Sequence, residues 1–304
     1  MPSLLTVEHL IKIFPGSAKP SVNDISFSLN EGEVLGILGP NGAGKTTTIQ
    51  MILGTLTVTS GSISYFGKNF SRHRSEILKH VGFATTYVRL PELLTVEENL
   101  KFFGYLSGLS NPQPQVNEMI DMFNLKHIKN EKAGSLSTGQ LARVMLAKAF
   151  LARPRIVILD EPTASLDPDI SHSIRHLIVH MKQEYKTSIV FTSHNMEEVT
   201  EVCDRVIVFK QGQLIADGTP AHLASTVSKA KVQLVITQGI ETLRSFAQQK
   251  HLVITFKDRF IEIEVEESEI AQLLTQLASL GIHYSHISIE KPTLEDYFLR
   301  IAQI

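Results

Sequence analysis

The chain has 304 residues, of which 43% are hydrophobic and 20% charged, so it is long and apolar enough to bury a sizeable core. Its formal net charge of -2, without a polybasic run, argues against a nucleic-acid partner. The single cysteine, Cys203, excludes an internal disulfide framework and fits a reducing compartment, where we expect it to be a small buried residue. The N-terminus lacks the pattern of a signal peptide, and no window reaches about 18 uncharged apolar residues. Any work at a membrane is therefore expected to need a partner chain.

The first elements predict a mixture of strands and one helix. From Leu4 to Gly36, short alternating runs such as DISFSL are typical of half-buried antiparallel strands. From Val34 to Leu53, an apolar strand is followed by a glycine-rich loop and then by a helix. A strand, a flexible loop and a helix in this order are the frame in which proteins hold phosphate groups.

The loop itself carries the pattern G-x-x-x-x-G-K-[ST]. Its glycines let successive backbone N–H groups turn inward around an anion, and the following helix points its positive N-terminal end at the same anion. Lys45 is expected to reach the β- and γ-phosphates, and the Thr46 hydroxyl to ligate Mg²⁺. A chance match occurs in about one chain of this length in a hundred. The predicted nucleotide-binding residues are Gly39, Pro40, Asn41, Gly42, Ala43, Gly44, Lys45, Thr46 and Thr47.

A mostly helical region follows, from about residue 93 to residue 152. Thr95 with Glu98 forms a capping box, and the loop SNPQPQ separates that helix from the next. In the stretch LSTGQ, Ser137 and Gln140 form a second capping box, which opens a further helix. Taken alone, this stretch indicates only a well-capped helix.

Residues 155–218 alternate continuous apolar strands with helical segments, the pattern of a buried parallel sheet. The strand Ile156–Leu159 brings Asp160 to its carboxyl end, where ligands bind in such sheets. Asp160 is expected to hold Mg²⁺, and Glu161 to polarise the attacking water; away from a phosphate loop, such a pair is simply solvated. A second apolar strand ends near His194, which could sense the γ-phosphate if the two strands are neighbours. The stretch RVIVFKQGQLIADG predicts a closing hairpin that turns at Gln211 and Gly212.

The composition changes near Pro220, and a separate small domain is predicted for residues 221–304. Strands are expected at 231–237, 252–257, 260–266 and 282–289, with helices at 240–250 and 268–280. This βαββαβ order indicates a ferredoxin-like domain. A last helix is expected over Leu294 to Ile301.

The motifs GPNGAGKT, LSTGQ, ILDEP, SLD and TSH, in this order, resemble the ATPase subunit of ATP-binding cassette (ABC) transporters over about residues 4–218. LSTGQ matches the family signature LSGGQ with Thr138 in place of the first glycine, and Arg143 stands where the family has an arginine. The resemblance implies an α/β P-loop NTPase with a parallel core sheet, an antiparallel β subdomain and a helical subdomain at about 93–152. It implies ATP and Mg²⁺ as cofactors, and Glu161 and His194 as catalytic residues.

The resemblance also implies a second chain. In this family two ATPase domains pack head to tail, and each signature completes the nucleotide site of the other. The residues expected to contact ATP across the dimer are Ser137, Thr138, Gly139, Gln140 and Asp167. Phe14 matches the aromatic position that stacks on adenine; the alternative for Phe14 is a core aromatic.

One position departs from the family pattern. Such proteins usually carry a glutamine at the hinge into the helical region, where Thr86 stands here. Threonine is too short to replace that amide, which puts the hydrolysis rate and the coupling to a membrane partner in doubt. The alternative is an alignment that has slipped in a variable loop.

The C-terminal EKPTLEDYFLRI resembles the end of ATPase subunits of exporters of drugs, polysaccharides or lipids whose membrane half is a separate chain. This implies a peripheral protein at the cytoplasmic face of a membrane, with a transmembrane permease and a second ATPase, identical or related, as partners. The segment Leu93–Gly108 is the expected contact with the permease. Three alternatives stay open: a regulatory half of a heterodimer with weak hydrolysis, a chromosome-handling ATPase and a ribosome-associated cassette. The last two are disfavoured because sustained heptads, a second cassette and a basic linker are missing from this sequence.

Overall fold

An antiparallel sheet begins the chain in the computed structural model, which describes residues 3–85, 90–226, 229–257 and 259–302. Its strands β1 (Ser3–Lys12), β2 (Val22–Asn30), β4 (Ser60–Tyr65) and β5 (Lys68–Asn69) lie in the order β2-β1-β4-β5. Alternate residues of β2 are buried, as the DISFSL pattern predicts. The expected antiparallel strands are therefore confirmed. Helix α2 (Phe70–Leu78) follows β5.

A second, six-stranded sheet has the order β10-β9-β3-β8-β7-β6. Its strands are β3 (Val34–Leu38), β6 (Val81–Thr85), β7 (Ile156–Asp160), β8 (Ser188–Thr192), β9 (Arg205–Lys210) and β10 (Gln213–Gly218). The strands from β9 to β6 are parallel, and every residue of β3, β7 and β8 is buried, as expected when both faces of a sheet are covered. Strand β10 adds an antiparallel edge through a turn in which Gln211 and Gly212 both have positive φ, which confirms the predicted hairpin.

Helix α1 (Lys45–Ile52) contributes its apolar side chains to one core that it shares with both sheets. That core includes Leu5 and Leu29 of the antiparallel sheet, Ile37 and Ile158 of the parallel sheet, and Ile49 of α1. Helices α6 (Pro168–Tyr185) and α7 (Met196–Val202) follow β7 and β8. Because β3 leads directly into α1, the shared core positions the loop between them.

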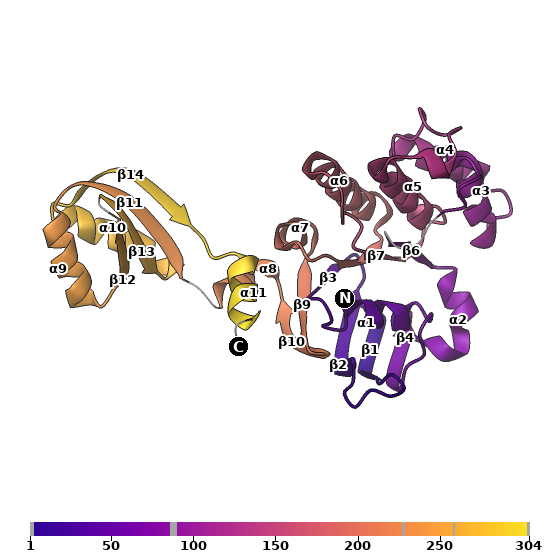
Figure 1. Ribbon diagram of the computed structural model, residues 1–304, viewed down its shortest axis with the longest axis horizontal. Coiled ribbons are helices and arrows are strands. Elements are labelled where there is room, and N and C mark those ends of the chain that lie inside the picture. The colour runs from indigo at the N-terminus through magenta and orange to yellow at the C-terminus, as the bar shows by residue number, and fades with distance from the viewer. Residues whose placement is uncertain (1–2, 86–89, 227–228, 258, 303–304) are drawn as a thin grey trace. The chain divides into compact units, whose positions relative to one another are not determined.

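The helical region contains α3 (Val96–Leu106), α4 (Gln113–Met122), the short 3₁₀ helix η1 (Ala133–Ser135) and α5 (Thr138–Phe150). Figure 1 shows α3, α4 and α5 grouped together, away from the antiparallel sheet of the same unit. Both predicted capping boxes are present, at Thr95–Glu98 and at Ser137–Gln140. The start of α5 is therefore set by its own sequence.

The chain divides into two compact units, residues 1–220 and residues 221–304, with α8 (Pro220–Ser225) at the boundary. In the second unit, β11 (Ala230–Gln238), α9 (Ile240–Lys250), β12 (Val253–Lys257), β13 (Phe260–Val265), η2 (Glu267–Glu269), α10 (Ile270–Ser279) and β14 (His283–Glu290) follow in order. The antiparallel sheet β12-β13-β11-β14 has the ferredoxin-like arrangement. Val232, Leu234, Ile261 and Ile263 point to the face that α9 and α10 cover. Helix α11 (Leu294–Ala302) ends the described chain.

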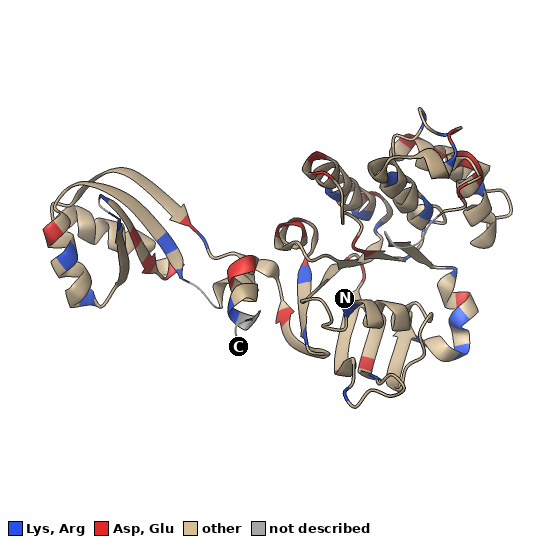
Figure 2. Cartoon of the chain, viewed as in Figure 1, with Lys and Arg blue, Asp and Glu red and all other residues tan. Residues whose placement is uncertain are grey.

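Charged side chains of both signs are interspersed over the elements of each unit (Figure 2). Within the described ranges, no helix combines the length and the apolar character that crossing a bilayer demands. Cys203 is buried, as expected from the sequence.

Candidate active site

The loop between β3 and α1 follows a path that requires glycine at two positions. A Cβ atom on Gly39 would lie 2.5 Å from the carbonyl oxygen of Phe209, a distance that no side chain tolerates. Gly44 has φ = 104°, and a Cβ there would lie 2.7 Å from the carbonyl oxygen of Ser21. The predicted phosphate loop is thus closely packed against neighbouring backbone, which holds its N–H groups in place.

Lys45 begins α1 and turns its side chain back over this loop. Its Nζ donates hydrogen bonds to the carbonyl oxygens of Gly39, at 2.6 Å, and Pro40, at 3.2 Å. Burial lowers the pKa of Lys45, while the carboxylates of Glu161 and Asp160 oppose that shift. The ammonium group therefore faces both the loop and the acidic residues at the end of β7. Thr46, the next residue, is exposed.

Asp160 and Glu161 stand where β7 ends, beside the end of β8. The strands are parallel neighbours with Asp160 opposite Thr192, which confirms the arrangement on which the interpretation of His194 depends. Thr192 Oγ1 donates to Asp160 Oδ1 at 2.7 Å and accepts from the N–H of Glu161 at 3.0 Å. Burial raises the pKa of Asp160, whereas the Thr192 hydrogen bond and the Lys45 charge lower it. Thr192 thus positions both acids.

Glu161 and His194 contact each other directly: His194 Nδ1 lies 2.7 Å from Glu161 Oε2. The His194 side chain is 67% exposed and that of Glu161 only 15%, so the carboxylate lies deeper in the protein than the imidazole. Glu161 has φ = 52°, a left-handed conformation that is uncommon for residues other than glycine and that turns the chain sharply after β7. A carboxylate held by a histidine at the sheet edge can orient a water molecule for attack.

The signature residues lie at the start of α5, against α6. Gln140 N–H donates to Ser137 Oγ at 3.3 Å, and Ser137 N–H donates to Gln140 Oε1 at 2.9 Å. Gly139 is buried, and a Cβ there would lie 2.9 Å from Ile170 Cδ1. Thr138 is exposed at the same helix end.

Two further predicted residues lie close to this contact. Asp167 is exposed at the N-cap of α6, three residues before Ile170, and Arg143 of α5 donates to Ser173 Oγ of α6 at 2.7 Å. The structure therefore brings the beginnings of α5 and α6 together and presents Thr138 and Asp167 to solvent.

Phe14 follows β1 and is 38% exposed, so its ring is not part of the core. Lys12 Nζ lies 5.2 Å from the centroid of the ring. The exposed part of the Phe14 ring can receive a flat ligand. Thr86, the doubtful hinge position, lies outside the described residues; its neighbour Thr85 ends β6 opposite Asp160.

Sequence reasoning missed Thr192 and a buried network behind the Glu161–His194 pair. Glu198 Oε2 accepts from Thr163 Oγ1 at 2.6 Å and from Ser193 Oγ at 2.8 Å. Thr163 follows Glu161 by two residues and Ser193 precedes His194, so Glu198 ties the two loops together. In the sequence, these contacts are marked only by hydroxyl residues at positions 163, 192 and 193. Threonine and serine are too common at the ends of strands and in loops to predict such contacts.

The fold and this site define a P-loop protein that binds and hydrolyses a nucleoside triphosphate. A family model described as ABC transporter matches residues 22–164. The chain is 31% identical to the linearmycin resistance ATP-binding protein LnrL of Bacillus subtilis (strain 168), over 98% of each chain. It is 30% identical to the bacitracin transport ATP-binding protein BcrA of Bacillus licheniformis, over 99% of this chain and 98% of that one. It is 34% identical to the Nod factor export ATP-binding protein I of Burkholderia lata, over 92% and 91%.

Solved structures give the same result. The structure of an ATP-binding subunit of an ABC transporter superposes with a TM-score of 0.67 at 27% identity, over 74% of this chain and 93% of that one. The ADP conformation of MJ1267, an ATP-binding cassette of an ABC transporter, has a TM-score of 0.63 at 26% identity, over 72% and 92%. The chain therefore belongs to the ATP-binding subunits of ABC transporters. It is an ATP hydrolase that powers transport.

Proposed function

We propose that this subunit energises export through a separate transmembrane permease, as a peripheral protein on the cytoplasmic face of the cell membrane. The linearmycin resistance and Nod factor export proteins among its relatives support an exported compound as cargo, and the resemblance of the C-terminal segment favours a drug, a polysaccharide or a lipid. The observation that carries the proposal is the convergence of Lys45, Asp160, Glu161 and His194 at one edge of the parallel sheet, in a chain aligned along nearly its whole length with such relatives. Residues 1–220 form the ATPase domain and residues 221–304 a separate small domain.

In this proposal the chain's own residues divide the work of ATP hydrolysis. The loop from Gly39 to Thr47 binds the phosphates, and Lys45 exchanges its carbonyl partners for phosphate oxygens. Glu161 orients the attacking water, and His194 contacts the γ-phosphate and holds the Glu161 carboxylate. Phe14 stacks on the adenine ring.

Magnesium is the cation that the donor set fits, since a hydroxyl and a carboxylate are oxygen ligands of the kind it prefers. Thr46, exposed at the start of α1, and Asp160 would hold it. Burial raises the pKa of Asp160, as expected for a carboxylate that lacks a full counter-charge. A bound cation would supply that counter-charge. When bound, the cation neutralises charge on the phosphates.

A second copy of the chain completes each site across the dimer. Ser137 through Gln140 and Asp167 are assigned to this contact because the fold presents the beginnings of α5 and α6 together while Thr138 and Asp167 stay exposed. The bare N–H groups at the start of α5 favour an anion such as the γ-phosphate.

Helix α3 is assigned to the permease contact. Phe102, Tyr105 and Leu106 share one face of α3 by their i, i+3, i+4 spacing, and all are exposed, as is Leu93 just before the helix. Such clustered apolar side chains mark an interaction surface. Leu106→Glu is expected to abolish co-purification of the permease with the tagged subunit. Ile215→Glu, which changes an exposed apolar residue on β10, serves as the matched control.

The first test is the composition of the complex isolated from native membranes on tagged Glu161→Gln protein with ATP and Mg²⁺. Two copies of this chain with one or two polytopic proteins support the proposal. A different ATPase as the second subunit would replace the homodimer with a heterodimer, and a complex without membrane proteins would contradict the export role. In the same preparation, a hydrolysis rate for Glu161→Gln equal to that of the parent would refute the role of Glu161.

A further inference from the structure

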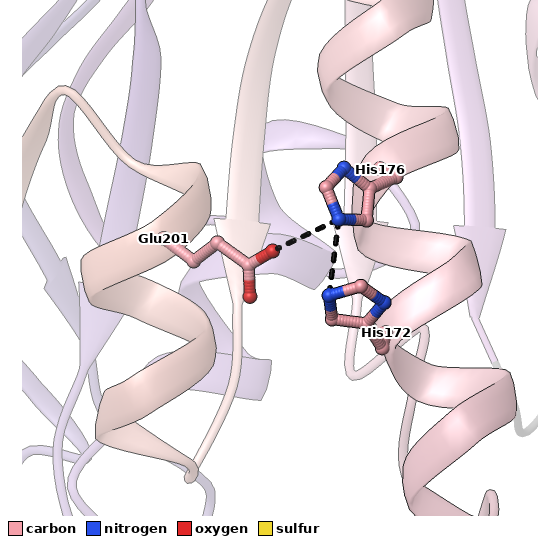
Figure 3. Close-up of side chains that lie close together, drawn as sticks. All are labelled: His172, His176 and Glu201. Carbon is pink, nitrogen blue, oxygen red and sulfur yellow. Dashed lines mark hydrogen bonds and ion pairs between the residues drawn. The ribbon is translucent and has the colours of Figure 1, made fainter.

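Three side chains that commonly bind metals converge on the surface between α6 and α7, outside the nucleotide site. His172 and His176 lie one turn apart on α6, and Glu201 reaches toward them from the last turn of α7 (Figure 3). The Nε2 atoms of the two histidines are 3.0 Å apart, and His176 Nε2 is 3.9 Å from Glu201 Oε1. All three candidate ligand atoms lie within 4.8 Å of one another. The residues are exposed, so an ion can reach them from solvent.

These separations suit a tetrahedral ion. Ligand atoms that each lie about 2.0–2.1 Å from zinc are separated by about 3.3 Å in a tetrahedron. The two distances in the structure, 3.0 Å and 3.9 Å, lie on either side of that value. Because both histidines and Glu201 are exposed, their side chains have room to rotate toward that separation. Two histidines at i, i+4 on one helix are also a known zinc-binding spacing.

A second layer of contacts orients the carboxylate. Arg175 Nε donates to Glu201 Oε2 at 2.5 Å, and its NH1 group lies 3.4 Å from Glu198 Oε1. The Arg175 side chain is only 11% exposed, so this anchor is fixed within the α6–α7 contact. With Oε2 held by Arg175, Oε1 is the oxygen that faces His176, as Figure 3 shows. Two carboxylates and one guanidinium leave the group with one negative charge, which favours a cation.

We propose that His172, His176 and Glu201 form a binding site for a divalent transition-metal ion, with Zn²⁺ as its preferred occupant. Two imidazoles and one carboxylate suit Zn²⁺, whereas Mg²⁺ and Ca²⁺ prefer sets of oxygen ligands. Three protein ligands leave a fourth position for water. The site is distinct in chemistry from the all-oxygen cation position proposed at Thr46 and Asp160.

The location gives such an ion a structural effect on the active-site loops. Helix α6 begins after Asp167, and α7 begins after His194 and Asn195. An ion that joins the two helices therefore fixes the elements that follow both loops. Arg175 and Glu198 connect it further to Thr163 and Ser193, beside the Glu161–His194 pair.

The test is a metal titration of the full chain, stripped of metals and without a histidine tag. Co²⁺, which shows intense visible absorption when tetrahedral, is titrated first and then displaced with Zn²⁺. One Co²⁺ per chain and its displacement by Zn²⁺ in the presence of excess Mg²⁺ are expected. Loss of a supporting contact around a metal already costs about 10–100-fold in affinity, so H172Q, H176Q and E201Q are each expected to weaken binding by more than about 100-fold.

His180→Gln is the matched control, because His180 is exposed on the same helix one turn beyond His176 and lies outside the cluster. H180Q is expected to bind like the parent. The proposal is overturned if the parent binds no more tightly than the H172Q/H176Q double variant, or if H180Q weakens binding as much as H172Q. Since the readout is metal binding, its outcome is independent of ATP hydrolysis, and E161Q should bind the metal unchanged.

Discussion

Gly139 is predicted to be required for packing within the chain, in addition to any contact across a dimer. A Cβ at this position would lie 2.9 Å from Ile170 Cδ1 and 3.0 Å from Ile170 Cγ2, closer than side chains normally approach. Gly139 is the second residue of α5, so alanine is compatible with its backbone. The effect of Gly139→Ala on stability therefore tests the contact between α5 and α6.

Two opposing terms set the size of the effect. Overpacking a close contact costs about 1–3 kcal/mol. Alanine in place of a helical glycine returns about 0.5–1 kcal/mol. The free energy of unfolding of Gly139→Ala is therefore expected to fall by up to about 2.5 kcal/mol, the difference of those terms. In an Ile170→Ala background the overpacking term is removed, and the same change is expected to be neutral or slightly stabilising.

The assay is equilibrium urea unfolding followed by far-UV circular dichroism, since the chain has no tryptophan to report by fluorescence. The four proteins of the double-mutant cycle are compared on the transition of the unit that contains residues 1–220. The glycine term is the same in both backgrounds and cancels, so the coupling energy between positions 139 and 170 is expected to equal the overpacking term, about 1–3 kcal/mol. A coupling below about 0.5 kcal/mol, the usual error of additivity, would refute the packing argument.

The same cycle separates the two roles of Gly139 in ATP hydrolysis. If close packing against Ile170 is the whole requirement, Gly139→Ala loses activity and Gly139→Ala/Ile170→Ala regains the rate of the Ile170→Ala protein. If position 139 also approaches the γ-phosphate of a second chain, stability returns in the double variant while activity does not. The proposed trans contact predicts the second result.

Two other changes probe groups at the site and away from it. Thr192→Val removes the hydroxyl that bonds to Asp160 and is expected to cost about 1.5–3 kcal/mol in urea unfolding. The same change should raise the pKa of Asp160 further. Thr192→Ser keeps the hydroxyl and should lose much less free energy of unfolding; equal losses in the two variants would contradict the argument. Burial lowers the pKa of Lys148 to about 8, so Lys148→Met is expected to stabilise the protein at pH 7, by at most about 3 kcal/mol. Above pH 8 the folded parent loses the proton of Lys148 while the unfolded chain keeps it up to about pH 10, so the parent gains stability as the pH rises. The difference in thermal stability between Lys148→Met and the parent should therefore narrow above pH 8. A difference independent of pH would refute the burial argument.

The sequence predicted the parts of the molecule that depend on local pattern. The continuous apolar run Ile156–Leu159 is a fully buried strand, and the alternation in FIEIEV places Ile261 and Ile263 on the core side of β13. Capping residues at Ser137 and Gln140 located the start of α5. In each case the prediction rests on residues within a few positions of one another. At such short separations the geometry of a helix or strand alone decides which side chains share a face.

Contacts between distant segments could not be predicted in this way. Thr192 stands 32 residues from the Asp160 carboxylate that it bonds, and nothing about a threonine at a strand end marks it as a partner of that acid. His172 and His176 share a helix face by spacing, but their meeting with Glu201 depends on how α7 packs on α6. Ile170 gives no sign in the sequence that it limits the residue at position 139. These relations arise from the register of parallel strands and the packing of helices.

The active site is also where local rules of stability are broken, and the breaks support one another. Glu161 has a left-handed backbone, Asp160 is a buried carboxylate with a raised pKa, and Lys45 is a buried amine with a lowered pKa. Each charge partly stabilises the other: Asp160 and Glu161 raise the pKa of Lys45, and Lys45 lowers that of Asp160. Lys148, by contrast, has its pKa lowered by burial alone. A shifted pKa is thus informative about function when several charged groups at one sheet edge shift the pKa values of one another. It is much less informative when burial of a single residue causes it.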